Sequence, residues 1–215
     1  MRLHHVPGSR SFRVLWLLEE LGLRAEILRY SLTDGSLRSA AFRATSPAGR
    51  VPALDIDGQV IFESAAIVQY LTEREGRLAP LPGTSERGAF LSWIGFAETQ
   101  ANIVQSLNLQ HIFLRPAEAR SVPLMRLETR RLEMTMKGLE AHLQGRETLL
   151  SDFSAADCML GFNLDAVFRF VRPDAYPSLL AYRNRMAARP AWRRAASLDG
   201  ESGIYSREFY ELPDG

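Results

Sequence analysis

Residues 49–64 read GRVPALDIDGQVIFES, and the fold prediction starts from this stretch. It holds two short apolar strands, Val51–Ile56 and Gln59–Phe62, and the dipeptide Asp57-Gly58 between them is the strongest local signal for a β-hairpin. Pro52 has no backbone N–H, so it starts its strand either as a trans proline on a sheet edge or after a cis peptide bond. We expect two adjacent antiparallel strands here.

The residues before the hairpin predict a strand–helix–strand unit. Leu3–Val6 is typical of a short strand, and the amphipathic run Ser11–Leu21 predicts a helix that stops at Gly22. Arg24–Tyr30 alternates like a second strand, and Ser36–Ala44 permits a short irregular helix. The N-terminal part should therefore form a βαβ unit that continues into an antiparallel hairpin.

The residues after the hairpin predict helices only. One helix begins at Ser64 and stops at Gly76, and the segment 77–84 then interrupts every periodicity with two prolines and a glycine. The later helical patterns cover residues 85–114, 124–143, 155–170 and 178–188. We therefore expect an α/β domain over residues 1–76, a linker over 77–84 and an all-helical domain over 85–215.

Composition excludes several classes of protein. The chain has 26 basic and 25 acidic side chains, so no overall field favours nucleic acid or an anionic membrane. Its single cysteine, Cys158, excludes an internal disulfide framework and a Cys-x-x-Cys redox pair. The N-terminus lacks the apolar region of a signal peptide, and no uncharged apolar run approaches ~18 residues. We expect a cytoplasmic protein.

The first group of candidate site residues is the turn before the first helix, which holds Ser9, Arg10 and Ser11. Hydroxyls and backbone N–H groups at a helix N-terminus can bind an anion. The alternative is that Ser9 or Ser11 only caps the helix.

The second and third groups flank the hairpin. Around Arg50, Val51 and Pro52, the backbone could pair with an extended peptide as a neighbouring strand would. Glu63 and Ser64 follow the hairpin, where Ser64 is a natural N-cap and the first N–H groups of the helix could also bind a carboxylate. These two interpretations of Ser64 are compatible.

Taken in this order, the three groups resemble the glutathione-binding domain of glutathione S-transferases. The resemblance continues through residues 16–23, the proline-rich linker and residues 153–157, where Ser154 and Asp157 form a predicted N-terminal capping box. It implies a thioredoxin-like N-terminal domain, a helical-bundle C-terminal domain that forms the electrophile pocket and the dimer interface, a homodimer, and glutathione as co-substrate. The Pro-Gly-Ser turn is similar to that of the bacterial-type, serine-using, theta/nu-like branch.

The resemblance also implies a role for each candidate residue. Ser9 would face the sulfur and is favoured over Ser11, which stays a competitor, while Arg10 would contact the substrate or donate to Ser9. Arg50 and Val51 would hold the cysteinyl backbone along the Val51-Pro52 edge. The γ-glutamyl end would bind through Glu63, which takes the amine, and Ser64, which takes the carboxylate.

Other functions on the same fold stay open. A glutathione-dependent isomerase or peroxidase would share the glutathione site, and a non-catalytic interaction protein would share only the fold. A glutaredoxin-like oxidoreductase needs a cysteine where this chain has Ser9. No metal site is expected, because His4 and His5 point to opposite faces of a strand and the other two histidines, His111 and His142, lie on different helices.

The favoured function is detoxification by transfer of glutathione to an electrophile, in a homodimer. The apolar residues Phe90, Trp93 and Phe96 follow the linker and exceed what one small bundle needs to cover. We therefore expect the fourth and fifth helices, with the end of the N-terminal domain, to form the dimer interface.

Overall fold

The computed structural model describes residues 1–213, and these group into two compact units. Unit 1 comprises Met1–Arg87 and Ala188–Gly203; unit 2 comprises Gly88–Ala187 and the described part of Ile204–Gly215. Residues 188–203 were assigned to the helical domain by the sequence, whereas in the structure they group with the N-terminal unit. Asp214 and Gly215, the end of that predicted domain, lie outside the described residues.

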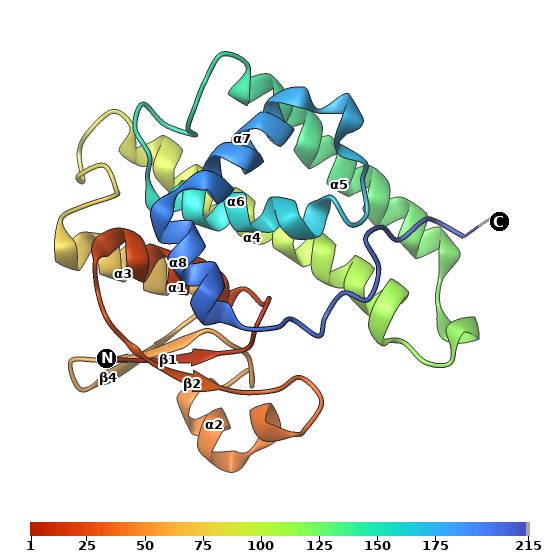
Figure 1. The fold of residues 1–215 in the computed structure, drawn as a ribbon, viewed down its shortest axis with the longest axis horizontal. Coiled ribbons are helices and arrows are strands. Elements are labelled where there is room, and N and C mark those ends of the chain that lie inside the picture. The colour runs from red at the N-terminus through yellow and green to blue at the C-terminus, as the bar shows by residue number, and fades with distance from the viewer. Residues whose placement is uncertain (214–215) are drawn as a thin grey trace. The chain divides into compact units, whose positions relative to one another are not determined.

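Unit 1 is built on a four-stranded sheet whose strands lie in the order β2-β1-β3-β4 (Figure 1). The strands are β1 (Arg2–His5), β2 (Glu26–Arg29), β3 (Ala53–Ile56) and β4 (Gln59–Phe62). β1 and β2 are parallel, and the β1–β3 and β3–β4 pairs are antiparallel. This is the thioredoxin-like sheet that the sequence predicts.

Helices cover both faces of this sheet. α1 (Ser11–Leu21) and α3 (Ser64–Glu75) lie on one face, and α2 (Ala40–Thr45) lies on the other (Figure 1). The bounds of α1 are those predicted, because Gly22 adopts the left-handed conformation that ends a helix (φ 72°). The predicted helix over 36–44 is a 3₁₀ turn, Ser36–Arg38, followed by α2.

One helix of unit 1 was not predicted. α8 (Pro190–Asp199) packs against α1, with the Phe12 and Trp192 rings 5.7 Å apart. Arg189, the residue before α8, donates to both carboxylate oxygens of Glu20 at 2.6 and 2.9 Å. No helix was predicted after residue 188, yet a proline such as Pro190 is favoured at the first position of a helix because its missing N–H would have no partner there.

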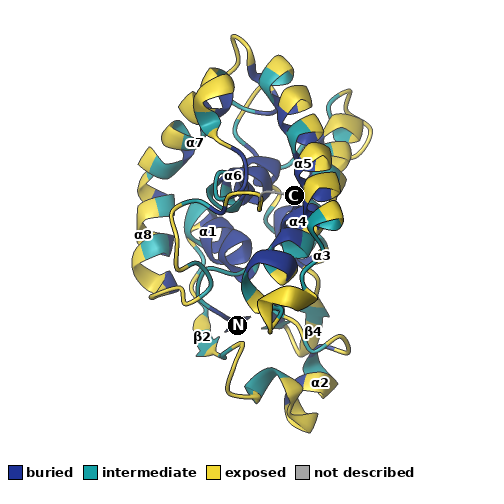
Figure 2. Ribbon diagram, turned by 90° about the vertical axis from the view of Figure 1, so that its right-hand side faces the viewer, coloured by how far each residue is buried: buried dark blue, intermediate teal, exposed yellow. Residues whose placement is uncertain are grey.

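Unit 2 is helical, as predicted. Its helices are α4 (Arg87–Asn108), α5 (Val122–Leu143), α6 (Ala155–Val167) and α7 (Pro177–Ala188), with 3₁₀ turns at Ala117–Ala119 and Pro173–Ala175. Figure 2 shows α6 mostly buried. The capping box of Ser154 and Asp157 is present, and the buried Asp157 carboxylate also accepts from Tyr182 Oη at 2.8 Å.

The predicted helix over 85–114 ends early. α4 stops at Asn108, and a π-helical turn, Leu109–Phe113, continues it until Leu114 N donates to Leu109 O at 2.9 Å. Pro116 follows after a cis peptide bond. The apolar pattern continued through this turn, so the sequence did not reveal the change of helix type.

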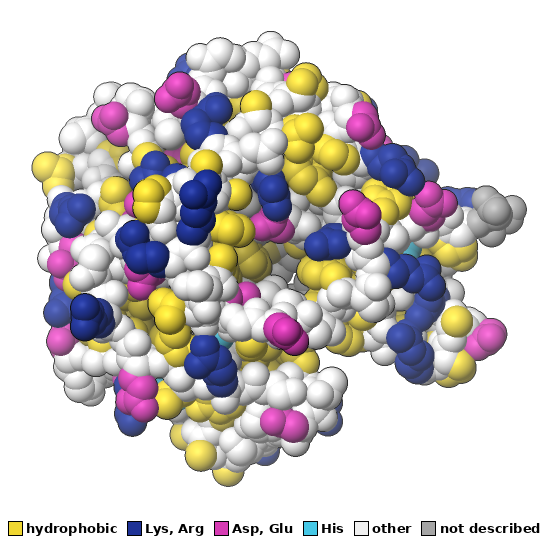
Figure 3. All heavy atoms as spheres, viewed as in Figure 1, with side chains coloured by type: hydrophobic (Ala, Val, Ile, Leu, Met, Phe, Trp, Pro, Cys, Tyr) yellow, Lys and Arg dark blue, Asp and Glu magenta, His cyan; other side chains and the backbone are white. Residues whose placement is uncertain are grey.

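Surface charge is mixed. Acidic and basic side chains are interspersed over most of the face shown in Figure 3, in keeping with a formal net charge of +1. Across residues 1–213, every helix is too short or too polar to cross a membrane.

Candidate active site

Strand register brings the three candidate groups to one end of the sheet of unit 1. His4 of β1 pairs with Ala53 of β3, and Ala53 pairs with Phe62 of β4. The turn after β1, the segment before β3 and the segment after β4 therefore leave the sheet at the same edge. These are the segments that hold Ser9, Val51-Pro52 and Glu63-Ser64.

The turn between β1 and α1 presents Ser9 at the surface. Ser9 N donates to Val6 O at 3.1 Å, and Phe12 N donates to Ser9 O at 2.9 Å, so the turn is closed on both sides. The residue at the N-cap of α1 is Arg10, which makes no capping hydrogen bond with its side chain. Ser9 Oγ, one residue earlier, accepts from Ser11 N at 3.3 Å, so the Ser9 side chain does satisfy an N–H group of the first turn although Arg10 holds the N-cap position; Ser11 is the first residue of the helix and is not its N-cap.

Ser11 lies beneath Ser9 and is fully buried, while Ser9 is half-buried. Ser11 Oγ lies 2.8 Å from Ser9 Oγ and 2.8 Å from His5 Nδ1, and it accepts from Val6 N at 3.2 Å. Because these partners enclose the Ser11 hydroxyl, Ser9 is the one of the two serines that reaches the surface.

The buried end of this chain of contacts is a histidine–carboxylate pair. His5 is completely buried, and its Nε2 lies 3.1 Å from Asp199 Oδ1, at the last residue of α8. The same carboxylate accepts from Gly8 N at 3.0 and 3.3 Å, which ties the turn to α8. His4 points to the other face, as predicted, and its Nδ1 lies 2.9 Å from Tyr30 Oη.

The segment before β3 is an ordered loop with a cis Val51-Pro52 peptide bond, one of the two alternatives left open by the sequence. Ser46 Oγ donates to Arg50 O at 2.8 Å and accepts from Arg50 N at 3.3 Å, which fixes the loop. Pro52 is buried, Val51 is half-buried, and the Arg50 side chain is exposed. Val51 precedes the paired residues of β3, so its backbone lies at the end of the ladder.

The start of α3 differs from the prediction. The N-cap is Glu63, and Ser64 is the first residue of the helix, so the assignment of Ser64 as N-cap is wrong. Glu63 is exposed with φ 69° and ψ 122°, a conformation that is strained for a residue other than glycine. Such outliers are common where a backbone is shaped for a ligand.

Ser64 is instead tied to α1. It is buried, and its Oγ accepts from Arg13 Nη1 at 2.9 Å; the Arg13 side chain is fully buried. The guanidinium adds positive charge beneath a helix N-terminus that already carries a partial positive charge. The two together favour a carboxylate at the start of α3.

The contacts of His5, Arg13 and Asp199 were not predicted from the sequence. Arg13 carried no distinct signal, because it lies at i, i+7 from Glu20, on the same side of the predicted helix and away from the centre of its apolar stripe. His5 was considered only as a metal ligand. No local signal links Asp199 to a residue 194 positions before it.

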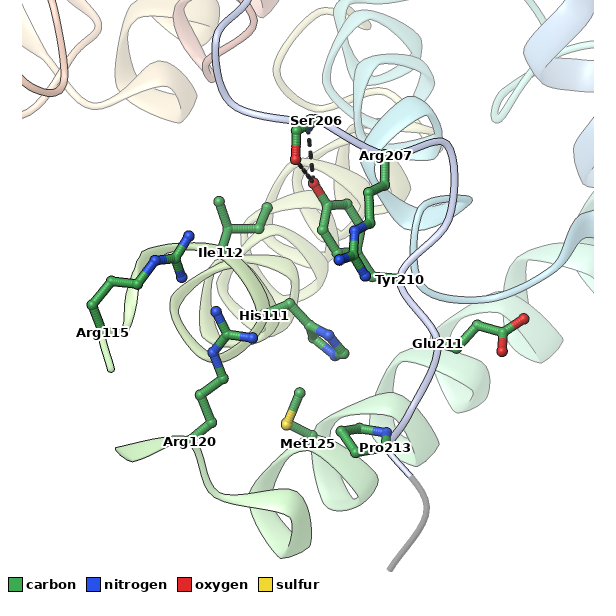
Figure 4. A pocket seen from close by; sticks show the side chains of 10 residues that line it. All are labelled: His111, Ile112, Arg115, Arg120, Met125, Ser206, Arg207, Tyr210, Glu211 and Pro213. Atoms are coloured by element: carbon green, nitrogen blue, oxygen red, sulfur yellow. Dashed lines mark hydrogen bonds between the residues drawn. The ribbon is translucent and has the colours of Figure 1, made fainter. Parts of the chain in front are cut away.

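Unit 2 has a separate cationic cavity of about 210 Å³ (Figure 4). Its lining includes the guanidinium groups of Arg115, Arg120 and Arg207 and the rings of His111 and Tyr210. Burial, followed by the charges of Arg120 and Arg207, lowers the pKa of His111 from 6.5 to about 4. None of these residues was a predicted site residue.

Comparisons with known proteins agree with the fold. The family model for the glutathione S-transferase N-terminal domain matches residues 1–73. The chain is 31% identical over 155 residues to the glutathione S-transferase-like protein LUC7 of Fusarium sp., covering 68% of this chain and 67% of that protein. It is 28% identical over 208 residues to glutathione S-transferase 3 of Schizosaccharomyces pombe, covering 90% and 86%. A solved sphingomonad glutathione S-transferase complexed with glutathione superposes with a TM-score of 0.78 at 29% identity, covering 93% of this chain and 98% of that one.

Proposed function

We propose that this chain, which belongs to the glutathione S-transferase family, binds glutathione, stabilises its thiolate and transfers it to an electrophilic small molecule. The observation that carries the proposal is the strand register of unit 1, which gathers the Ser9 turn, the cis Val51-Pro52 segment and the start of α3 at one edge. A tripeptide has three distinct parts to bind, and this edge offers a group suited to each.

In the proposed complex, Ser9 donates its hydroxyl hydrogen to the glutathione sulfur, with Arg10 beside it. Arg50 and the backbone of Val51 hold the cysteinyl part. This assignment is supported by the half-exposed Ser9 hydroxyl and by the position of Val51 at the end of the β3 ladder.

The γ-glutamyl end would bind at the start of α3. Glu63 would pair with the amine and Ser64 would bind the α-carboxylate with the first N–H groups of the helix. The strained, exposed Glu63 and the buried Arg13 that donates to Ser64 support this assignment. An anion at this position gains from both the helix N-terminus and the guanidinium.

The energy required of Ser9 is modest. The pKa of the glutathione thiol, ~8.5 when free, must fall by roughly 2 units for the thiol to be largely ionised at pH 7. This shift needs about 2.7 kcal/mol of preference for the thiolate. A hydrogen bond from a hydroxyl to a charged sulfur contributes about 1.5 to 3 kcal/mol, and a helix N-terminus about 0.3 to 1 more. These contributions suffice without a metal ion.

We further propose a serine-using detoxification enzyme that acts in the cytoplasm as a homodimer. The buried cysteine Cys158 fits a reducing compartment. Phe90 is buried inside unit 2, so its side chain is not available for an interface. Leu91 on α4 and Met134 on α5 are exposed, as is Phe62 on the edge strand β4. Exposed apolar side chains on these elements support an interface there.

The function is tested by the variant Ser9→Ala, with Ser197→Ala as control, because Ser197 is an exposed serine on α8 of the same unit. Glutathione affinity is measured by calorimetry, thiolate by ultraviolet absorbance, and conjugation with a panel of electrophiles. We expect Ser9→Ala to lower kcat/KM by roughly ten- to a hundred-fold and to raise the apparent pKa of the bound thiol toward ~8.5. The proposal fails if the wild-type protein does not bind glutathione. It also fails if the thiol of bound glutathione titrates identically in wild type and Ser9→Ala.

A further inference from the structure

Behind Ser9, a continuous chain of hydrogen bonds runs into the interior of unit 1. Ser9 Oγ lies 2.8 Å from Ser11 Oγ, Ser11 Oγ lies 2.8 Å from His5 Nδ1, and His5 Nε2 lies 3.1 Å from Asp199 Oδ1. Only Ser9 is half-exposed; the other three residues are buried. The chain therefore connects the surface hydroxyl to a buried imidazole and carboxylate.

The direction of these bonds follows from the partners of His5. Nε2 faces Asp199 Oδ1 at 3.1 Å and the Asp199 backbone oxygen at 3.3 Å, and both are acceptors, so Nε2 carries a hydrogen. In the neutral ring, Nδ1 is then an acceptor. The Ser11 hydroxyl has two acceptors, Val6 O at 3.2 Å and His5 Nδ1 at 2.8 Å, and we assign its hydrogen to the shorter contact with Nδ1. Ser11 Oγ in turn is left to accept from Ser9. In this state the Ser9 hydrogen points inward.

Asp199 holds both ends of this arrangement in place. One carboxylate accepts from His5 and also from Gly8 N, the residue before Ser9. α8, which carries Asp199, is fixed to α1 by the bidentate pair of Arg189 and Glu20. This carboxylate fixes the tautomer of His5 and anchors the turn that carries the Ser9 hydroxyl. Such an arrangement is suited to positioning a proton transfer.

We propose that Ser11 and His5 relay the thiol proton of glutathione away from Ser9, with Asp199 as the positioning residue; the inference rests on the proposed function. The S–H bond breaks as its proton passes to Ser9 Oγ, the Ser9 proton passes to Ser11 Oγ, and the Ser11 proton passes to His5 Nδ1. The products are a thiolate and an imidazolium paired with the Asp199 carboxylate. The hydrogen bonds between the sulfur and His5 Nδ1 have reversed, so Ser9 now donates to the thiolate, while His5 Nε2 still donates to Asp199.

The relay gives a role to both serines, Ser9 in the turn and Ser11 at the start of α1. A hydroxyl that only stabilised a thiolate would need no second serine beneath it, and the thiol proton would leave to water. With the relay, the proton stays on His5 until the thioether forms, and then returns through Ser11 and Ser9 to the leaving anion or to water. The atoms balance over the whole turnover.

The test compares two quantities for glutathione binding near neutral pH, the thiolate formed and the protons released. Ultraviolet absorbance gives the thiolate formed per bound glutathione, and calorimetry in buffers of different ionisation enthalpy gives the protons released. In wild type, we expect more thiolate than released protons, because the proton is retained on His5. Equal numbers in wild type would overturn the relay.

The variants are His5→Phe and Asp199→Asn, with His4→Phe as the matched control. His4 is the neighbouring buried histidine on the opposite face of β1 and lies outside the relay. We expect the relay variants to bind glutathione, to release one proton for each thiolate formed, and to lose roughly 10²-fold in kcat, the lower end of what a positioned general base contributes. His4→Phe should behave as wild type.

The outcomes separate the relay from the function it rests on. If wild type binds no glutathione or forms no thiolate, the proposed function fails and the relay with it. If wild type forms thiolate and Asp199→Asn, folded by circular dichroism, keeps the wild-type proton count, only the relay fails. Should His5→Phe not fold, the nearly isosteric Asp199→Asn and the wild-type count together decide.

Discussion

Acidification should destabilise unit 2 through His111, a residue of the π-helical turn. The residue is 9% exposed, and its ring lies 5.3 Å from the ring of Phe170 and 5.9 Å from that of Tyr210. Burial and the nearby charges of Arg120 and Arg207 lower its pKa from 6.5 to about 4. In the unfolded chain the same histidine takes up its proton near 6.5.

The sign follows from proton uptake. Between pH 6.5 and about 4 the unfolded chain binds one more proton at His111 than the folded chain does, so the free energy of unfolding falls as the pH falls. The full shift corresponds to about 3 kcal/mol at the acid end, and about 2 kcal/mol is lost already at pH 5. Above pH 7 the effect of this residue is nearly absent.

The assay is urea unfolding from pH 7.5 to 4.5 for wild type and His111→Gln, with the wild-type imidazole titration followed by NMR. We expect His111→Gln to lose about 2 kcal/mol less than wild type between pH 7 and 5. Identical pH slopes in the two proteins, or a wild-type ring that titrates near 6.5, would show that His111 does not cause the acid destabilisation.

Two other predictions concern the turn and the assembly. Gly8→Ala should lower the free energy of unfolding by more than about 2 kcal/mol, because Gly8 has φ 71° and an added Cβ would lie 2.1 Å from Ser202 Oγ. Thermal unfolding measures the loss. The control is Gly203→Ala, whose added Cβ meets nothing within 4 Å. Light scattering at micromolar concentration should give twice the 24.2 kDa chain mass, and a monomer mass would rule out the homodimer.

The parts of the fold that the sequence predicted well depend on local signals. β4 has the predicted bounds because Asp57-Gly58 sets the hairpin, and α3 ends at the predicted Gly76 with φ 62°. Strand ends without such signals moved: Arg24–Tyr30 was predicted where β2 spans Glu26–Arg29. Ladder pairing, which decides those ends, depends on the neighbouring strand and not on the segment alone.

In the candidate site, too, the features with local signals could be predicted and those that depend on distant residues could not. Ser9 and Ser11 could be found because they lie in one turn, but their unequal burial could not, since it depends on His5 and on a carboxylate from α8. Asp157 shows the same limit in unit 2: its bond with Ser154 is a local motif, whereas its bond with Tyr182 joins residues 25 positions apart.

This limit has a functional consequence for α8. The hydrogen of a hydroxyl goes to whichever acceptor the fold supplies, so the behaviour of Ser9 depends on partners that no motif around Ser9 encodes. A relative that kept the Pro-Gly-Ser turn but lacked a carboxylate at the end of α8 would lose the acceptor that holds the hydrogen on His5 Nε2 and the bond that anchors Gly8. In such a protein Ser9 could still stabilise a thiolate, but the proton would leave to water. In the proposed relay, the residue that positions the proton acceptor, Asp199, therefore lies near the other end of the chain from Ser9, the serine proposed to face the sulfur.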